Sequence, residues 1–306
     1  MINRIEGNYM KVLVVGKASL DTYISIDGFV KENTRSNIKT KLECPSGSAF
    51  VSASLLSLWG EETYFNGIIG RDDAGNKILR YAKNIGLNTD YLLKKQIETT
   101  KNYVILNRYN SSNTILSNIN KNKAETIDIE ITPDVILLDS EEYELSKMAI
   151  ESFPNSKKII NLYNINESTL KLCKKCEYII CSKEFAELIS KERLDYTKPD
   201  TLKKVLNEMC EVYNSEVIIT LGNKGCLYRV DDKTKIMGAI KVIKKDETGA
   251  RDIFAGAFAY AIGKNLPIEK SLKIAIIASG LSVKKIGSTT SIPDITEVYE
   301  IYAKNR

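Results

Sequence analysis

Histidine is absent from the 306 residues of this chain. Its absence excludes the Ser-His and Cys-His pairs of nucleophilic enzymes, so any general base has to be Asp, Glu, Lys, Tyr or Cys. It also argues against structural zinc, because the one CxxC pair, Cys173 and Cys176, has no second pair and no histidines to complete four ligands. Six cysteines in a chain of this length do not indicate a disulfide framework.

Long apolar runs are also missing. No stretch reaches the length that spans a bilayer, and the polar residues 1–9 lack the apolar centre of a signal peptide. We therefore expect a cytoplasmic protein with no membrane partner, whose residues 1–10 form a short N-terminal extension. The net charge of +5 comes from scattered lysines, without a basic stripe and interleaved aromatics, so nucleic acid is not an expected partner.

What the sequence does contain is an alternation of short apolar runs with helical patterns. Buried strands are predicted at 11–16 (KVLVVG), 134–138, 158–162, 178–181 and 216–221. Strands that alternate with helices predict a mainly parallel, doubly wound sheet covered on both faces, which is a three-layer α/β/α fold. The length suits one large domain over 11–306.

Two regions break this alternation. Their residues alternate between apolar and polar as antiparallel strands do, at 23–30, 37–44, 102–109 and 114–119. We expect a small antiparallel β lid, inserted from about 22–44 and 100–120. The apolar residues of these strands indicate a homodimer formed through the lid, because exposed apolar sheet tends to pair; they include Tyr23, Ile26, Val30, Tyr103, Ile105 and Ile115.

The stretch 246–263 (DETGARDIFAGAFAYAIG) is the most informative. Its apolar periodicity predicts a buried helix that begins near Gly249, where small residues leave backbone N–H groups free to bind an anion. Asp252 would lie in the first turn beside that anion. Abstraction of a proton from an attacking hydroxyl explains a carboxylate there. The alternative is that Asp252 only complements the helix dipole.

This stretch resembles the C-terminal signature of the PfkB/ribokinase family, D-T-x-G-A-G-D-x-F-x-G-A. The resemblance implies a ribokinase-like fold and ATP-dependent phosphorylation of a sugar or sugar-like alcohol, with Mg²⁺ as a cofactor. Gly249, Ala250 and Arg251 would form the anion hole with Asp252, which would be the catalytic base. Arg251 stands where the family has Gly, and it could either crowd the phosphates or supply a cation to them.

Two further segments resemble nucleotide-binding positions of the family. Thr220, Gly222 and Gly225 match a T-x-G-x-x-G turn that lies along the nucleotide phosphates and ribose. Ser279 is assigned to the nucleotide site by the same resemblance. Without this context, the 220–225 segment is a common turn after a strand.

The substrate positions depart most from the family. Residues 46–53 match the signature G-G-x-x-x-N-x-A only partly: Gly47 agrees, whereas Val51 replaces the Asn that holds a substrate hydroxyl. Asp21 matches a sugar-hydroxyl ligand, or it is a turn aspartate. Arg108 could meet a substrate carboxylate or phosphate, or be a solvated surface charge. Ribose, a ketohexose, a sugar acid, a sugar phosphate and a nucleoside all remain open as acceptors.

The metal positions are less distinct. Residues 181–186 take the place of an N-x-x-E segment that organises Mg²⁺, either with Glu184 as the Glu or in a register that places Phe185 there. Asp246, with Gly287 and Ser291, resembles a loop that binds a monovalent cation such as K⁺, and a plain Gly/Ser turn is the alternative. These departures also motivate a second hypothesis, a catalytically impaired relative that binds ligands or regulates.

Overall fold

The computed structural model describes residues 9–119 and 127–304. An eight-stranded sheet forms its centre. In spatial order the strands are β14 (Lys233–Met237), β13 (Cys226–Val230), β12 (Glu216–Thr220), β11 (Tyr178–Ser182), β10 (Lys157–Asn161), β9 (Val135–Leu138), β1 (Lys11–Val15) and β4 (Glu62–Asn66). Neighbouring strands pair in parallel from β4 to β12, whereas the β12–β13 and β13–β14 pairs are antiparallel. The five predicted strands are β1 and β9 to β12.

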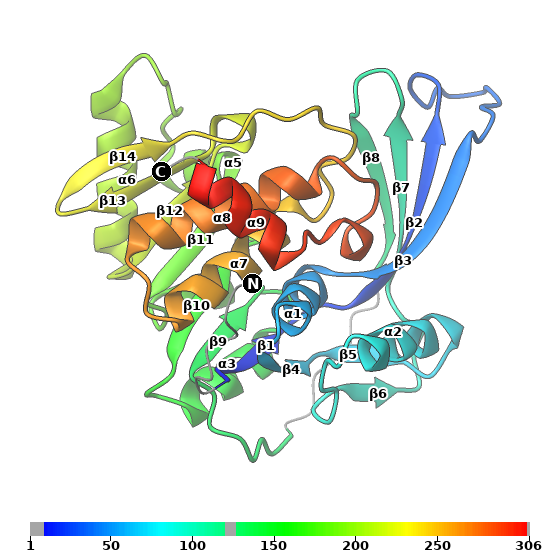
Figure 1. Cartoon of the computed structure of the whole chain (residues 1–306), viewed down its shortest axis with the longest axis horizontal. Helices are drawn as coiled ribbons and strands as arrows, with labels where there is room; N and C mark the ends of the chain where they lie inside the picture. The colour runs from blue at the N-terminus through cyan, green and yellow to red at the C-terminus, as the bar shows by residue number, and fades with distance from the viewer. Residues whose placement is uncertain (1–8, 120–126, 305–306) are drawn as a thin grey trace.

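Helices cover both faces of this sheet (Figure 1). One layer comprises α1 (Ser48–Leu58), α2 (Asp73–Asn84), α7 (Ala250–Gly263), α8 (Ile268–Ser282) and α9 (Ile295–Lys304). The other comprises α3 (Tyr143–Ser152), α4 (Glu167–Cys173), α5 (Lys183–Ser190) and α6 (Pro199–Tyr213). Strands such as β9 are buried at every residue because both their faces meet helices. The predicted three-layer α/β/α fold is confirmed.

The order of the strands reverses between β1 and β9. From β1 the chain continues to β4 on one side, and it later adds β9 to β12 on the other side. In open α/β sheets, ligands bind at such a reversal, beyond the carboxyl ends of the strands. The N-terminus of α7 lies at the same end, since Asp252 contacts the end of β10. Within the described ranges, no helix is long and apolar enough to cross a bilayer.

A second, four-stranded sheet forms the lid and rises beside the central domain (Figure 1). Its strands, in spatial order, are β3 (Thr40–Ser46), β2 (Ser19–Ile26), β7 (Lys101–Asn107) and β8 (Asn113–Asn118). The β2–β3 and β7–β8 pairs are antiparallel as expected, and β2 joins β7 in parallel. A small third sheet pairs β5 (Ile68–Gly70) with β6 (Leu93–Lys95).

The register of the lid places its apolar residues on two faces. Tyr23 and Ile115 both pair with Val104 and share the inner face, where Tyr23 and Val104 are buried. Ile105 lies on the outer face, because successive side chains of a strand point to opposite sides. The prediction that Tyr23, Ile105 and Ile115 lie on one side was therefore wrong. The periodicity of each strand was visible in the sequence, but the register between strands was not.

Residues 1–8, which belong to the predicted N-terminal extension, and residue 120, at the end of the predicted lid segment, lie outside the described residues. Met10, the last residue of that extension, is buried, and its backbone N–H donates to Glu61 Oε2 over 3.0 Å.

Candidate active site

At the first turn of α7, Ala250 N donates to Glu247 O over 3.1 Å, and the amides of Arg251 and Asp252 have no partner among the described backbone hydrogen bonds. Gly249 is the N-cap residue with φ 80°, and no side chain caps this end of the helix. A Cβ on Gly249 would lie 2.9 Å from Ser288 Cβ, so both the backbone angle and the available space call for glycine here. Ala250 and Arg251 follow inside the helix. The four first-turn amides of a helix have no partners within it, and they can hold an anion such as a phosphoryl group.

Asp252 lies inside this first turn, only 6% exposed. Its Oδ1 accepts a hydrogen bond from Asn161 Nδ2 over 3.0 Å and a very short one from the Tyr163 hydroxyl. Burial raises the pKa of this carboxyl to about 7, although the Tyr163 hydrogen bond and the Arg251 charge oppose that rise. A carboxyl whose pKa lies near neutrality is suited to general base work.

The side chain of Arg251 extends toward Tyr163. Its guanidinium carbon lies 3.9 Å from the centre of the Tyr163 ring. Arg251 has a helical, negative φ, unlike Gly249, so its backbone conformation does not need glycine. The backbone at this position therefore accommodates Arg251 without a positive φ.

A second buried carboxylate, Asp139, lies at the strand-order reversal. It follows β9 and accepts from Lys17 N over 2.7 Å, from Ala49 N over 3.2 Å and from the Ser48 hydroxyl, which ties the start of α1 to the end of β1. A Cβ on Gly16 would lie 2.1 Å from the Asp139 carboxyl carbon. Burial raises the pKa of Asp139 to about 6.

Sequence reasoning missed Asn161, Tyr163 and Asp139. The available signal was their position, because each is a polar residue at or just after the end of a buried parallel strand. Such ends meet at one edge of a sheet. The sequence alone did not predict which of these three side chains would contact Asp252.

The predicted substrate residues come from α1 and from the lid. Gly47 is the N-cap of α1 with φ 102°. Val51 is fully buried and packs beside Gly249, and its apolar side chain cannot bind a hydroxyl. Asp21, on the inner face of the lid, accepts from Ser19 Oγ and Asn102 Nδ2, both over 2.7 Å. The Oδ1 of Asn102 is buried without a hydrogen-bond partner.

Arg108 lies apart from this group. It forms a 3.0 Å ion pair with Asp27, and its side chain is 52% exposed. The described contact of Arg108 is with Asp27 and not with Asp252.

The predicted nucleotide residues follow β12. Thr220 ends that strand, and its hydroxyl donates to Cys181 O over 3.1 Å. Gly222 and Gly225 have φ of 58° and 96°; Gly222 begins the 3₁₀ turn η1 (Gly222–Lys224), and Gly225 follows it. A Cβ on Gly225 would lie 1.8 Å from Met237 O, so glycine is required there. Ser279, on α8, donates to Ile276 O over 3.3 Å.

The structure brings Asp246 and Gly287 together. Asp246 Oδ2 accepts from Gly287 N over 2.9 Å, while its Oδ1 accepts from the Thr248 hydroxyl over 2.7 Å. Ser291, in the short turn η2 (Thr289–Ser291), donates to Ser288 O over 2.8 Å. Glu184 is exposed in the first turn of α5, whereas Phe185 is buried. Among the described residues, no cluster of three acidic, cysteine or histidine side chains could hold a metal ion.

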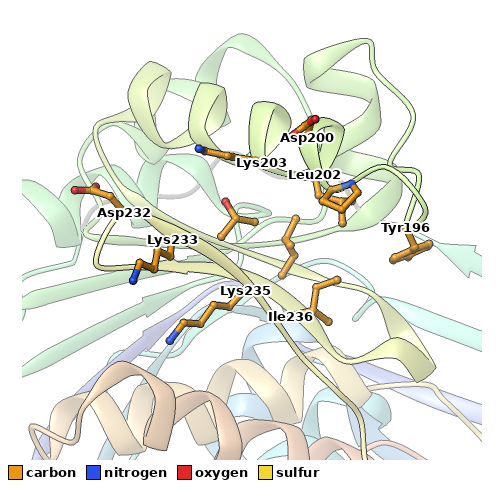
Figure 2. Close-up of a pocket in the computed structure, with 11 residues that line it drawn as sticks. Tyr196, Asp200, Leu202, Lys203, Asp232, Lys233, Lys235 and Ile236 are labelled. Carbon is orange, nitrogen blue, oxygen red and sulfur yellow. The ribbon is translucent and has the colours of Figure 1, made fainter.

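A groove of about 470 Å³ lies elsewhere, between α6 and the β13–β14 hairpin (Figure 2). Its lining includes Tyr196, Leu202 and Ile236, with lysines at its rim. None of the predicted site residues lines it.

Comparison with known proteins identifies the family of this chain. Residues 10–295 match the pfkB family carbohydrate kinase domain. The ribokinase of Bacillus subtilis is 25% identical over 306 residues, covering 95% of this chain and 98% of that protein. The ribokinase of Lactococcus lactis is 38% identical over 93 residues, 30% of this chain and 31% of that protein.

Solved structures show the same fold. The ribokinase of Thermotoga maritima superimposes with a TM-score of 0.80 at 24% identity, covering 97% of this chain and 100% of that one. The Arabidopsis thaliana ribokinase complexed with ribose and ATP gives a TM-score of 0.76 at 20% identity, with 96% and 99% covered. The protein therefore belongs to the pfkB family of carbohydrate kinases, which are phosphotransferases with an alcohol group as acceptor.

Proposed function

We propose that this enzyme transfers the γ-phosphoryl group of ATP to a hydroxyl of a sugar or sugar-like alcohol. The observation that carries the proposal is the position of Asp252, buried inside the uncapped first turn of α7. A base and an anion site then lie within one turn of helix. In-line phosphoryl transfer needs both, because the attacking hydroxyl loses a proton while negative charge builds up on the phosphoryl oxygens.

Asp252 would take the proton from the acceptor hydroxyl. Asn161 and Tyr163 both donate to its Oδ1, which fixes the plane of the carboxylate and presents Oδ2 to the substrate. The amides that begin with Gly249 would bind the transferred phosphoryl group. Thr220, Gly222 and Gly225, with Ser279, would border the nucleotide, as the resemblance to the family implies.

The acceptor would be held by the lid. Asp21 and Asn102 lie next to each other on its inner face, and the buried Oδ1 of Asn102 lacks a donor. A sugar hydroxyl would satisfy this acceptor, and the Asp21 carboxylate could accept from a neighbouring hydroxyl. The relatives that match 95% and 78% of this chain are named ribokinase and deoxyribokinase, so pentoses are the first acceptors to test.

The chain's own groups fit a magnesium ion that arrives with the nucleotide. Mg²⁺ keeps several waters and is bound mainly by phosphates and one or two carboxylates, so it does not need a carboxylate cluster, and the described residues form none. Glu184 is the candidate carboxylate, through water. For a monovalent cation the candidates are Asp246, Gly287 and Ser291. Activity measured in K⁺ and in Li⁺ at equal ionic strength tests this role, because only K⁺ should stimulate.

The test of the main proposal is ATP consumption with a panel of pentoses, hexoses, sugar acids and nucleosides, each with and without Mg²⁺. We expect stoichiometric formation of one phosphorylated sugar. Asp252→Asn should keep ATP binding while lowering kcat by about two to four decades. Wild-type turnover by Asp252→Asn would refute the assignment of the base.

One observation favours a second function, a ligand-binding relative with impaired chemistry. Val51 occupies the expected position of a hydroxyl ligand and offers no polar atom. In that case calorimetry would detect sugar and nucleotide binding, while no acceptor of the panel would be phosphorylated.

A further inference from the structure

Tyr163, Arg251 and Asp252 form one contiguous group. Tyr163 lies two residues after Asn161, the last residue of β10, whereas Arg251 and Asp252 are neighbours on α7. The Tyr163 hydroxyl donates to Asp252 Oδ1, and the guanidinium of Arg251 covers the face of the same ring at 3.9 Å. The aromatic side chain is thus held at its hydroxyl by one α7 residue and at its face by the residue before it.

The position of Arg251 is electrostatically unusual. It is the second residue of α7, where the helix dipole disfavours a cation. Among the described residues, no carboxylate forms an ion pair with Arg251 within 4.0 Å, and its Nε is buried without a hydrogen-bond partner. Its guanidinium lies instead over the Tyr163 ring, at 3.9 Å from the ring centre. A desolvated Arg over the face of a tyrosine is a strong form of this interaction.

We propose that Tyr163 and Arg251 act together as a positioning unit for the Asp252 carboxylate. Arg251 holds the Tyr163 ring, and Tyr163 holds Oδ1, so that Oδ2 faces the acceptor hydroxyl. The proposal rests on the function proposed above for Asp252. It assigns a role to Arg251, for which the resemblance to the family left two alternatives open, crowding of the phosphates and binding of the phosphates.

The surroundings explain why Asp252 needs such a unit. Asp252 is buried, and the charge of Asp139 acts on it from the end of β9. Both effects favour the protonated carboxyl, which cannot accept a proton. The Tyr163 hydroxyl, the Asn161 amide and the Arg251 charge favour the ionised form. Burial raises the pKa of Tyr163, so that its phenol remains protonated and can donate.

The experiment is a double-mutant cycle of Tyr163→Phe and Arg251→Ala, with kcat, KM and the pH profile measured for each variant. Tyr163→Phe removes only the hydroxyl. We expect it to lower kcat about tenfold to a hundredfold, with KM for ATP changed less than about twofold. The acid limb of kcat should move to higher pH. In the Arg251→Ala background the same change should cost less than about threefold, because the ring is no longer held.

Two further variants separate this role from general packing. Tyr64→Phe is the matched control, because Tyr64 also donates to a carboxylate, Glu62 Oε1 over 2.5 Å, on strand β4 away from α7. It should leave kcat and the pH profile unchanged. Arg251→Lys keeps the charge but loses the planar stack, and it should recover kcat only in part.

Titration of the Asp252 carboxyl by carbon-13 NMR gives a readout that does not require turnover. It should move to higher pH in Tyr163→Phe and in Arg251→Ala but not in Tyr64→Phe. Independent, multiplicative effects of the two changes on kcat, or an unmoved Asp252 titration, would overturn the positioning unit. A moved titration in an enzyme whose Asp252→Asn variant remains fully active would overturn the proposed function instead.

Discussion

Asn113, on lid strand β8, donates from Nδ2 to Thr248 Oγ1 over 3.2 Å, across 135 positions of sequence. Thr248 directly precedes Gly249, the N-cap of α7. In the same lid hairpin the Ser111 hydroxyl donates to Lys244 O over 2.9 Å. The tip of the lid is therefore bonded to the segment that leads into the proposed anion hole, so closure of the lid and the position of this segment are physically linked.

Removal of this bond should loosen the closed lid. For Asn113→Ala we expect KM for the sugar to rise about threefold to tenfold, since one hydrogen bond is lost. Hydrolysis of ATP in the absence of sugar should also change, because the lid excludes water. Asn118→Ala on the same strand is the control, since Asn118 bonds to Glu98 instead. Equal KM values for the two variants would mean that the Asn113–Thr248 hydrogen bond does not affect sugar binding.

The pH dependence of activity follows from Asp252. Its pKa is raised to about 7 by burial, so kcat/KM should increase with pH through that value as the carboxylate forms, and then level off. The rate profile of the wild type between pH 5 and 9 checks this. A profile that is flat below pH 7 would show that Asp252 is not the base.

The same pKa predicts an opposite trend in stability. An unfolded Asp titrates near 3.9, so the raised folded value of about 7 contributes stability that is present below about pH 4 and is lost as pH rises through 7. Asp252→Asn should therefore raise the free energy of unfolding at pH 8, by about 1–3 kcal/mol, and by much less at pH 5. Urea unfolding at the two pH values measures the difference.

Gly249 and Gly60 form a matched pair for testing the anion hole. Both have positive φ, 80° and 89°, but a Cβ on Gly249 would meet Ser288 at 2.9 Å whereas one on Gly60 would meet nothing within 4 Å. Each change to Ala should cost about 1 kcal/mol of stability. Only Gly249→Ala should also lower kcat, by displacing the amides. Equal kcat values in the two variants would contradict the anion hole.

The homodimer through the lid remains a prediction, and the register now defines its surface. Ile105 and Leu116 lie on the outer face, and the Leu116 side chain is 55% exposed. Leu116→Glu should split a lid dimer in light scattering and raise KM for the sugar. Leu188→Glu, at a similarly exposed apolar position on α5, should do neither. A monomeric, fully active wild type at micromolar concentration would exclude an obligate dimer.

The sequence predicted the central fold well because each parallel strand is a continuous apolar run, a local signal that needs no partner to be recognised. The lid was recognised from alternation, but its face assignments failed. The 246–252 motif located the helix N-terminus, since Gly249 and Asp252 lie within one turn of each other. Tyr163 was missed because it reaches Asp252 across 89 positions of sequence, through packing that no local pattern encodes.

The parallel pairing of β2 with β7 carries a last consequence. Asp21 and Asn102, which meet in that pairing, are separated by β3, α1, β4, β5, α2 and β6. The proposed sugar site thus cannot exist on any short fragment of the chain, and closing so long a loop has an entropic cost that only the finished domain offsets. We expect the lid to order last during folding. Sugar binding would then require that the rest of the molecule has already folded.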